Sequence, residues 1–448
     1  MQELSGFPYF EVEFTKDGGV YDLGLVQNVI DGVRDRGITD LFVISHGWNN
    51  DKAEARVLYA AFFGWVRNIL DGGIVPGAVG RKYGVLGVFW PSKKFAESEL
   101  IAGGGAASLG GRMSDAELIA QLDELKGVFD AEGADDLLEQ AKALVPKLED
   151  SPSARDQFVE LVRKLFPPAG ELEEEIPSGF FDEPGRDLIE RLGTPLDIES
   201  IAPVTSGGAA TSIGDGLPAM PGMGSAAGIG DFFNRIKTGV KNILNYTTYY
   251  QMKERAGKVG RNGVNMVLRE LRAVYPALKI HLIGHSFGGR VVTAAADGPD
   301  DRPAIVPDSM MLLQAAFSHN GFSGDYDGRG SAGFFRKVVT DKKVSGPLLV
   351  SHSIFDSAVG TAYPLASRIS RDVAAGLGDA NDKYGGIGRN GAQKTVEATF
   401  GNLLPVGGVY TFQGGHIYNL KADDYIKDHS DICSREVAQA LLSSVACT

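Results

Sequence analysis

The sequence predicts an α/β fold in which a mainly parallel central sheet is flanked by helices and carries a large helical insertion. Short apolar runs alternate with helical patterns over the N- and C-terminal thirds of the chain, and this alternation is typical of a parallel sheet with helices on its faces. Most runs are apolar throughout, as expected for strands that are covered on both sides. The strand-like runs stop between about residues 99 and 240, which indicates the insertion.

The expected elements follow one another along the two outer parts of the chain. We expect strands at Phe10 to Phe14, Leu41 to Ile44, Val85 to Phe89, Ile280 to Ile283, Met310 to Leu313, Leu348 to Val350, and at Val409 with its neighbours. Helical patterns lie at residues 21–35, 52–70, 250–275, 288–297, 357–374 and 432–445. The core is therefore expected to comprise residues 1–98 and 241–448, and the insertion residues 99–240.

Two helices are expected within the insertion. Ser114 and Glu117 form a capping-box pattern, which marks the start of a helix. Apolar residues then recur at helical spacing, at Leu118, Leu122, Leu125 and Phe129. A second helix, which carries Phe158, Leu161, Val162, Leu165 and Phe166, is expected to follow Ser153.

Glycine-rich segments border the insertion at residues 101–111 and 201–230. Two interpretations of 201–230 are open. Its Gly, Ser and Pro content is typical of a disordered surface loop. Alternatively, the segment forms the edge of a mobile lid that presents Leu217, Met220 and Met223 to a substrate.

The composition excludes several classes of protein. The 448 residues are 43% hydrophobic and 23% charged, which fits a globular protein and not a disordered or fibrous one. A formal net charge of −13, from 57 acidic and 44 basic residues, argues against nucleic acid as a partner. The two cysteines, Cys433 and Cys447, cannot build a disulfide framework or a multi-cysteine zinc site.

Segments that direct a chain to a membrane are not apparent in the sequence. No apolar run approaches the roughly 18 residues of a membrane-spanning helix, and the N-terminal stretch does not have the pattern of a signal peptide. We therefore expect a soluble, cytoplasmic protein without an integral membrane segment. Its oligomeric state is not predicted.

Residues Gly284 to Gly288 read GHSFG and contain the only G-x-S-x-G match in the chain. The pattern alone is weak, but here it directly follows an apolar run and opens a helical stretch, which is the strand-turn-helix setting that the motif needs. Small residues two places before and after the serine permit a tight turn, so the Oγ atom of Ser286 is expected to be exposed at the strand end. The alternative is a glycine-rich turn without chemistry.

Two backbone N–H groups are candidates for binding an oxyanion. A helix that begins directly after Ser286 aims the N–H of Phe287 at an oxygen that becomes negative during attack. The apolar run Leu41 to Ile44 leads into a His-Gly turn, where glycine allows close approach of the backbone, so the N–H of Trp48 is the second candidate. Alternatively, Trp48 serves only in packing, and its ring could also line an acyl pocket.

A catalytic serine needs a base, and the base needs an orienting acid; where the serine stands on a G-x-S-x-G turn between a strand and a helix, the chain order is serine, acid, histidine. Asp356 lies just beyond the strand expected at Leu348 to Val350 and is the candidate acid. The alternative is that it caps the helix that follows. His416 and His429 are the histidines after it, and we favour His429 because its loop leaves it free to reach Ser286.

The remaining histidines are dispersed along the chain. We expect structural roles for His46, His281, His285, His319 and His352. Because they are not grouped with carboxylates or cysteines, no metal site is predicted. No cofactor is expected either.

Together these residues resemble the α/β-hydrolase superfamily of serine esterases and lipases. The resemblance covers about residues 8–95 and 245–445, through HGW at 46–48, GHSFGG at 284–289, the acid near 356 and HSD at 429–431. The motifs FWPS at 89–92 and GRNG at 388–391 look like a bacterial branch of that superfamily. One departure is that the insertion precedes the nucleophile strand, whereas the usual cap comes after the strand that follows it, so no lid geometry is implied.

The resemblance implies an α/β-hydrolase fold and an acyl-enzyme route. Ser286 would attack the substrate, His429 would move the proton and Asp356 would orient the imidazole. Phe287 and Trp48 would bind the oxyanion through their backbone N–H groups.

The predicted function is therefore that of a metal-free serine hydrolase that cleaves a small-molecule or lipid carboxylic ester through an acyl-enzyme intermediate. One alternative is a lipase or phospholipase whose segment 201–230 touches lipid aggregates. Another is a catalytically silent, hydrolase-like binding protein. Amidases, thioesterases and acyltransferases use the same constellation, and neither the acyl length nor the alcohol part of the substrate is predicted.

Overall fold

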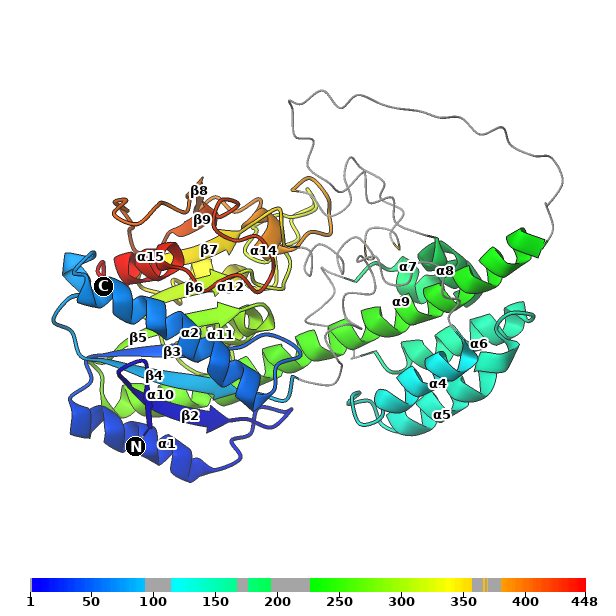
Figure 1. Cartoon of the computed structure of the whole chain (residues 1–448), viewed down its shortest axis with the longest axis horizontal. Coiled ribbons are helices and arrows are strands. Elements are labelled where there is room, and N and C mark those ends of the chain that lie inside the picture. Colours follow the sequence, from blue (N-terminus) through cyan, green and yellow to red (C-terminus); the bar gives the residue numbers. More distant parts are fainter. Residues whose placement is uncertain are drawn as a thin grey trace, which may run out of the picture.

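The computed structural model describes residues 2–92, 114–166, 176–194, 226–356, 366, 369 and 380–448, with the backbone alone at 226–231. These residues form a sheet unit and a helical unit. The long helix α9 (Ala226–Lys258) extends from one unit into the other (Figure 1). An α/β fold with a mostly parallel sheet is thereby confirmed.

The sheet has nine strands in the order β1-β2-β4-β3-β5-β6-β7-β9-β8. Strand β1 runs antiparallel to β2, and every other neighbouring pair is parallel. The strands are β1 Gln2–Leu4, β2 Phe7–Glu13, β3 Asp40–Ser45, β4 Tyr83–Phe89, β5 Lys279–His285, β6 Ser309–Leu313, β7 Leu348–His352, β8 Ala398–Asn402 and β9 Ile417–Lys421. Strands β2 to β7 confirm six of the predicted strands.

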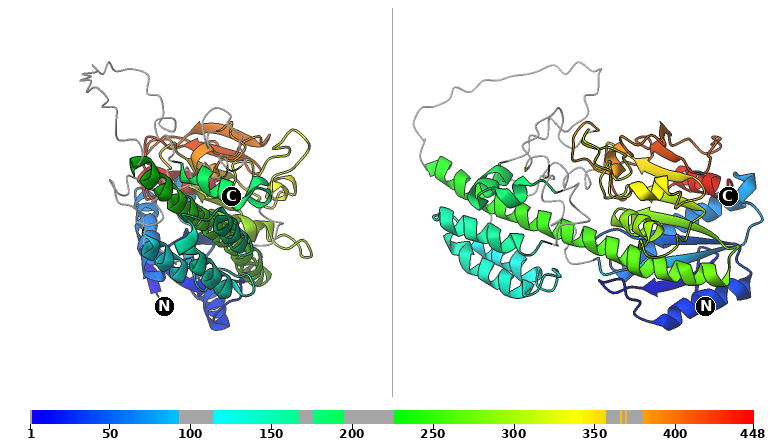
Figure 2. Two further views of the ribbon diagram at one scale, coloured as in Figure 1. Left: turned by 90° about the vertical axis from the view of Figure 1, so that its right-hand side faces the viewer. Right: turned by 180° about the vertical axis from the view of Figure 1, so that it is seen from behind.

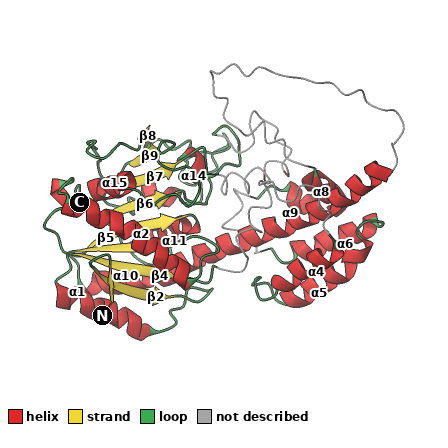
Figure 3. Cartoon of the chain, in the orientation of Figure 1, coloured by secondary structure: helices red, strands yellow, loops and turns green. Residues whose placement is uncertain are grey.

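Helices cover both faces of the sheet, as Figure 3 shows. Helices α2 (Lys52–Asp71) and α15 (Arg435–Val445) lie on the side that faces the viewer in Figure 1. Helices α1 (Leu23–Arg36), α10 (Asn265–Val274) and α11 (Phe287–Asp297) pack on the opposite face, which the right-hand view of Figure 2 presents. Within β3, Val43 belongs to one buried cluster and Ile44 to the other, so an apolar strand here has no solvent-facing side.

The helical unit consists of short helices that pack beside the N-terminal half of α9 (Figure 1). They are α4 Asp115–Glu124, α5 Ala134–Leu144, α6 Pro152–Arg163, α7 Gly179–Asp182 and α8 Gly185–Gly193. The capping box of Ser114 and Glu117 is present at the start of α4. Helix α6 begins earlier than expected, because Ser151 and not Ser153 caps it, and proline at 152 suits the first helical position.

Two predicted elements are wrong in place or extent. No strand forms at Val409, which is 83% exposed, because the segment around it turns at glycines such as Gly407, with φ 91°. The helix expected at 250–275 instead starts at Ala226 and passes through a π-helical segment, Val259–Val264, before α10. At Gly260 an added Cβ would lie 2.1 Å from the carbonyl oxygen of Val291, so the π segment lies directly against α11.

The expected border between insertion and core at residue 241 lies inside α9, which continues across it without a break. Residues 201–225 of the glycine-rich segment lie outside the described residues, so neither interpretation of that segment is tested. The helix expected at 357–374 also lies outside them, apart from residues 366 and 369.

Candidate active site

The strand order creates a topological switch point between β3 and β5. The chain leaves β3 for β4 on one side and leaves β5 for β6 on the other, and in open parallel sheets ligands bind outside the carboxyl ends of strands at such a point. Because Ser45 is in register with Gly284, the loop that contains Trp48 and the turn that contains Ser286 begin side by side.

Ser286 occupies a strained turn between β5 and α11. Its φ of 56° and ψ of −125° are a conformation that costs about 1–3 kcal/mol for a residue with a side chain. An added Cβ at Gly284 would lie 2.4 Å from the carbonyl oxygen of Gly288, and one at Gly288 would lie 2.1 Å from that of Ser45. Both glycines of the motif are therefore required by sterics.

Asp356 and His429 are joined by a hydrogen bond at the same edge of the sheet. Asp356 follows β7 and is fully buried, and its Oδ1 lies 2.9 Å from Nδ1 of His429 in the loop after β9. An ionised carboxylate accepts a hydrogen bond from Nδ1–H, which leaves Nε2 of His429 as the basic nitrogen. The His429 side chain is 18% exposed.

The surroundings of His429 set its affinity for a proton. Burial alone would lower its pKa, but the negative charge of Asp356 and the hydrogen bond to it outweigh burial, so the pKa of His429 lies above the usual value of 6.5. The imidazolium that forms when His429 accepts a proton is therefore stabilised by Asp356.

His285 connects the loop of His429 to the serine turn. Its Nε2 lies 2.9 Å from the backbone oxygen of His429, and the two ring centroids are 5.0 Å apart. Burial lowers the pKa of His285 to about 3, so the ring is neutral and its Nε2–H donates to the carbonyl. No hydrogen bond joins Ser286 directly to His429 among the described residues, and such contacts commonly tighten only when substrate binds.

The loop after β3 contacts Ser286 directly. An added Cβ at Gly47 would lie 2.6 Å from Cβ of Ser286 and 3.1 Å from its Oγ, so only glycine allows the backbone before Trp48 to come this close. Phe287 is the first residue of α11, and its N–H has no carbonyl partner within the helix. The ring of Trp48 packs on those of Phe287 and Tyr249, at 5.8 and 6.2 Å between centroids.

The FWPS motif supports this loop from β4. The ring of Trp90 stacks on that of His46 at 5.7 Å, and its Nε1–H donates to the carbonyl of His46 over 3.1 Å. The carbonyl of Ser92 accepts the N–H of Asn49 at 3.0 Å. The hydroxyl of Tyr59 accepts the N–H of His46 and donates to the carbonyl of Val88, both at 2.8 Å.

The other histidines lie away from Ser286 or are held in the core. Burial lowers the pKa of His46 to about 4 and that of His319 to about 3. His281 is buried between Ser309 and Asp40. The carbonyl of His416 accepts the N–H of Leu348 at the amino end of β7, opposite to the edge at which Ser286 lies.

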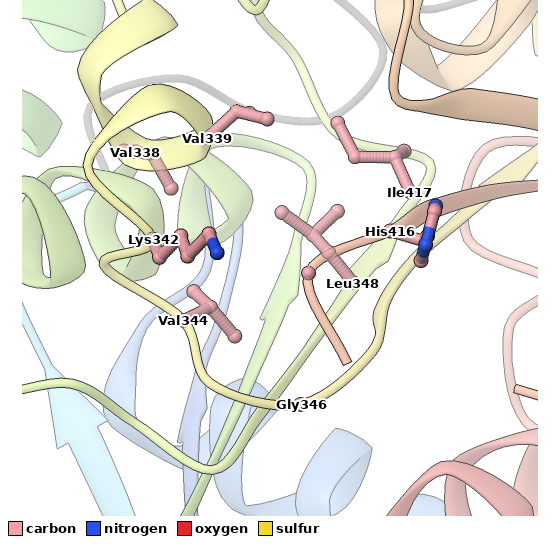
Figure 4. A pocket seen from close by; sticks show the side chains of 9 residues that line it. Val338, Val339, Lys342, Val344, Gly346, Leu348, His416 and Ile417 are labelled. Atoms are coloured by element: carbon pink, nitrogen blue, oxygen red, sulfur yellow. The ribbon is translucent and has the colours of Figure 1, made fainter. Parts of the chain in front are cut away.

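A shallow hollow of about 260 Å³, open to solvent, lies at that amino end (Figure 4). It is lined by Val338, Val339, Lys342, Val344, Gly346, Leu348, Gly415, His416 and Ile417. It is therefore separate from the switch point. Within the described ranges, no group of three or more His, Cys, Asp or Glu side chains is arranged to bind a metal ion, and none of the helices in that part of the chain has the length and apolarity needed to cross a membrane.

Sequence reasoning missed two residues at the carboxyl edge of the sheet, where Ser286 lies. Gln314 follows β6 directly and contacts Asp356, and the rule that polar residues at the ends of parallel strands gather at one edge could have identified it. Tyr249 packs its ring on Phe287 at 4.9 Å, but nothing in the sequence distinguishes it from the other tyrosines of α9.

Comparison of the chain with protein-family models, with curated proteins and with solved structures gives no match. The function must therefore be argued from the geometry of the site.

Proposed function

We propose that the chain has the α/β-hydrolase fold and acts as a serine hydrolase that cleaves carboxylic esters through an acyl-enzyme intermediate. The observation that carries the proposal is the Asp356–His429 pair, held at 2.9 Å beside the turn on which Ser286 stands. Strand-end loops supply all three side chains, in the chain order of serine, acid and histidine.

The reaction begins when the Oγ of Ser286 attacks the ester carbonyl while Nε2 of His429 takes the hydroxyl proton. Asp356 remains ionised and stabilises the imidazolium. The negative oxygen of the tetrahedral intermediate accepts hydrogen bonds from the N–H groups of Phe287 and Trp48.

The intermediate collapses as the bond to the alcohol breaks, and His429 returns its proton to the leaving oxygen. Water then repeats the sequence on the acyl-Ser286 ester: His429 takes a proton from the water, and the carboxylic acid leaves as Ser286 regains its hydrogen. Neither the formation nor the hydrolysis of the acyl-enzyme needs a redox partner or a metal ion to balance.

Labelling with a fluorophosphonate, followed by the intact mass of the protein, tests the proposal. We expect one adduct on the wild-type chain and none on Ser286→Ala. Esters of graded acyl length then define the substrate, with turnover expected to fall by several orders of magnitude in Ser286→Ala. A wild-type chain that takes up no label would favour a catalytically silent binding protein instead.

A further inference from the structure

Gln314 has an unusual backbone for a residue with a long side chain. It directly follows β6, is completely buried and has a φ of 44°. A positive φ is uncommon outside glycine and persists only where the surroundings support it. The neighbouring strand β5 is also followed by a residue of positive φ, Ser286, so strained backbone follows two adjacent strands at one edge.

The hydrogen bonds of Gln314 leave its side-chain amide only one orientation. Its Oε1 accepts the hydroxyl proton of Ser351 at 2.8 Å, and its Nε2 lies 2.9 Å from the carbonyl oxygen of Gly388. Because a carbonyl oxygen can only accept, Nε2 must face Gly388. The same nitrogen lies 3.3 Å from Oδ2 of Asp356, so its two hydrogens have one acceptor each.

The GRNG motif holds this amide in place. The carbonyl of Gly388 also accepts the N–H of Ser353, and the N–H of Gly388 donates to the carbonyl of Ala315, both at 3.0 Å. An added Cβ at Gly388 would lie 2.5 Å from the carbonyl carbon of Gln314. Glycine is thus required for the turn to lie against the backbone beside β6.

We propose that Gln314 is a positioning residue for the catalytic acid, and the proposal rests on the proposed function. By binding Oδ2, the amide fixes the plane of the Asp356 carboxylate so that Oδ1 faces Nδ1 of His429. The amide does not titrate, so this support is the same at every pH at which the protein folds. The GRNG turn acts indirectly, because the carbonyl of Gly388 accepts a hydrogen bond from the Gln314 amide.

The test compares two buried amide side chains, of which Gln314 contacts the catalytic acid and Asn419 contacts the turn. Gln314→Met keeps the length of the side chain but removes both N–H donors. Asn419 in β9 is the matched control: it is also fully buried and bound to the same turn, through both backbone groups of Ala392. Neither hydrogen bond involves Ser286, Asp356 or His429, so Asn419→Leu disturbs the turn alone.

The first measurement is steady-state turnover of an ester. We expect Gln314→Met to lower kcat by about tenfold or more, since small misplacements of a catalytic group cost that much, with KM changed less than about twofold. We expect Asn419→Leu to change kcat by less than about threefold. Equal losses in the two variants, or a loss in Gln314→Met that appears only in KM, would overturn the proposal.

The second measurement does not depend on turnover. The proton between Nδ1 of His429 and Asp356 should give a far-downfield proton NMR resonance, assigned by its loss in Asp356→Asn. We expect it to persist in Asn419→Leu and to broaden or vanish in Gln314→Met. If it persists unchanged in Gln314→Met, the positioning role is refuted, whether or not the wild-type chain hydrolyses esters.

A third variant covers the case in which Gln314→Met does not fold. Ser351→Ala retains the amide and its donors but removes the hydroxyl that fixes Oε1. We expect a smaller decrease of kcat with KM unchanged, and a broadened resonance. Wild-type values of both kcat and the resonance would contradict the proposal.

Discussion

Asp356→Asn is the substitution whose consequence follows most directly from the hydrogen bonds of the site. The carboxylate oxygens face different partners: Nδ1 of His429 at 2.9 Å and the Nε2 donor of Gln314 at 3.3 Å. In the variant, the asparagine oxygen faces Gln314 because that partner can only donate. The asparagine NH₂ group then faces His429, whose Nδ1 must accept, so the proton moves to Nε2 and the base is lost.

The expected loss of kcat follows from two energies, that of the wrong histidine tautomer and that of turning the asparagine side chain over. A catalytic histidine in the wrong tautomer costs about 10⁴ in kcat, or about 5.5 kcal/mol. Turning the asparagine over would restore the tautomer but would set two N–H donors against each other in a buried site, at about 1–3 kcal/mol. The turned-over form also lacks the negative charge that stabilises the imidazolium, so this further loss adds to the cost of turning over, and we expect kcat to fall by about 10²–10⁴, with KM little changed.

The assay is ester turnover, with fluorophosphonate labelling as a second readout. Asp423→Asn is the control: the Oδ1 of Asp423 accepts the N–H of Ile354 at 3.1 Å, which asparagine can also do, and the variant otherwise loses an ion pair with the exposed Lys421. The double variant Asp356→Asn with Gln314→Met removes the donor that orients the asparagine and should regain about tenfold. A single variant within tenfold of wild type, or no recovery in the double variant, would refute the reasoning.

Three further predictions rest on separate contacts. The acid limb of the kcat/KM profile should have a pKa above 6.5, because Asp356 raises the pKa of His429 and the base acts only when neutral; a profile that is flat from about pH 5 to 8 is the contrary outcome. His285→Gln keeps a donor to the carbonyl of His429 and should exceed His285→Met in kcat by about tenfold, whereas equal values would show that the hydrogen bond has no effect. Tyr59→Phe removes the hydroxyl that accepts the N–H of His46 and should lower the free energy of unfolding by about 1–3 kcal/mol in denaturant titration; an unchanged midpoint would argue against it.

The sequence predicted those parts of the fold that depend on local pattern. Most of strands β2 to β7 are apolar runs, so their existence followed from the local pattern, and the G-x-S-x-G turn followed from its place after one of them. The error at Val409 arose because an apolar residue beside glycines is as compatible with a turn as with a strand. The start of α9 was missed because its first residues are glycine-rich and lack a helical apolar pattern.

The supports of the site were less predictable, because they are long-range. Gln314 lies 42 residues before Asp356 and 74 before Gly388, and its importance appears only when three strands are placed side by side. The contact of His285 with the carbonyl of His429 spans 144 residues. The sequence assigned His285 a core role, which its burial agrees with, but could not indicate what its ring touches.

Helix α9 has a mechanical consequence for the site. Its 33 residues span about 50 Å at 1.5 Å per residue. Its N-terminal half lies backbone to backbone with α8, where an added Cβ on Gly239 would be 2.0 Å from the carbonyl oxygen of Ile189, and about 15 Å further along the helix Tyr249 touches Phe287. Because the helix is continuous between the two contacts, we expect a substitution that shifts α8 to displace the ring of Tyr249 where it packs on Phe287, the residue after Ser286.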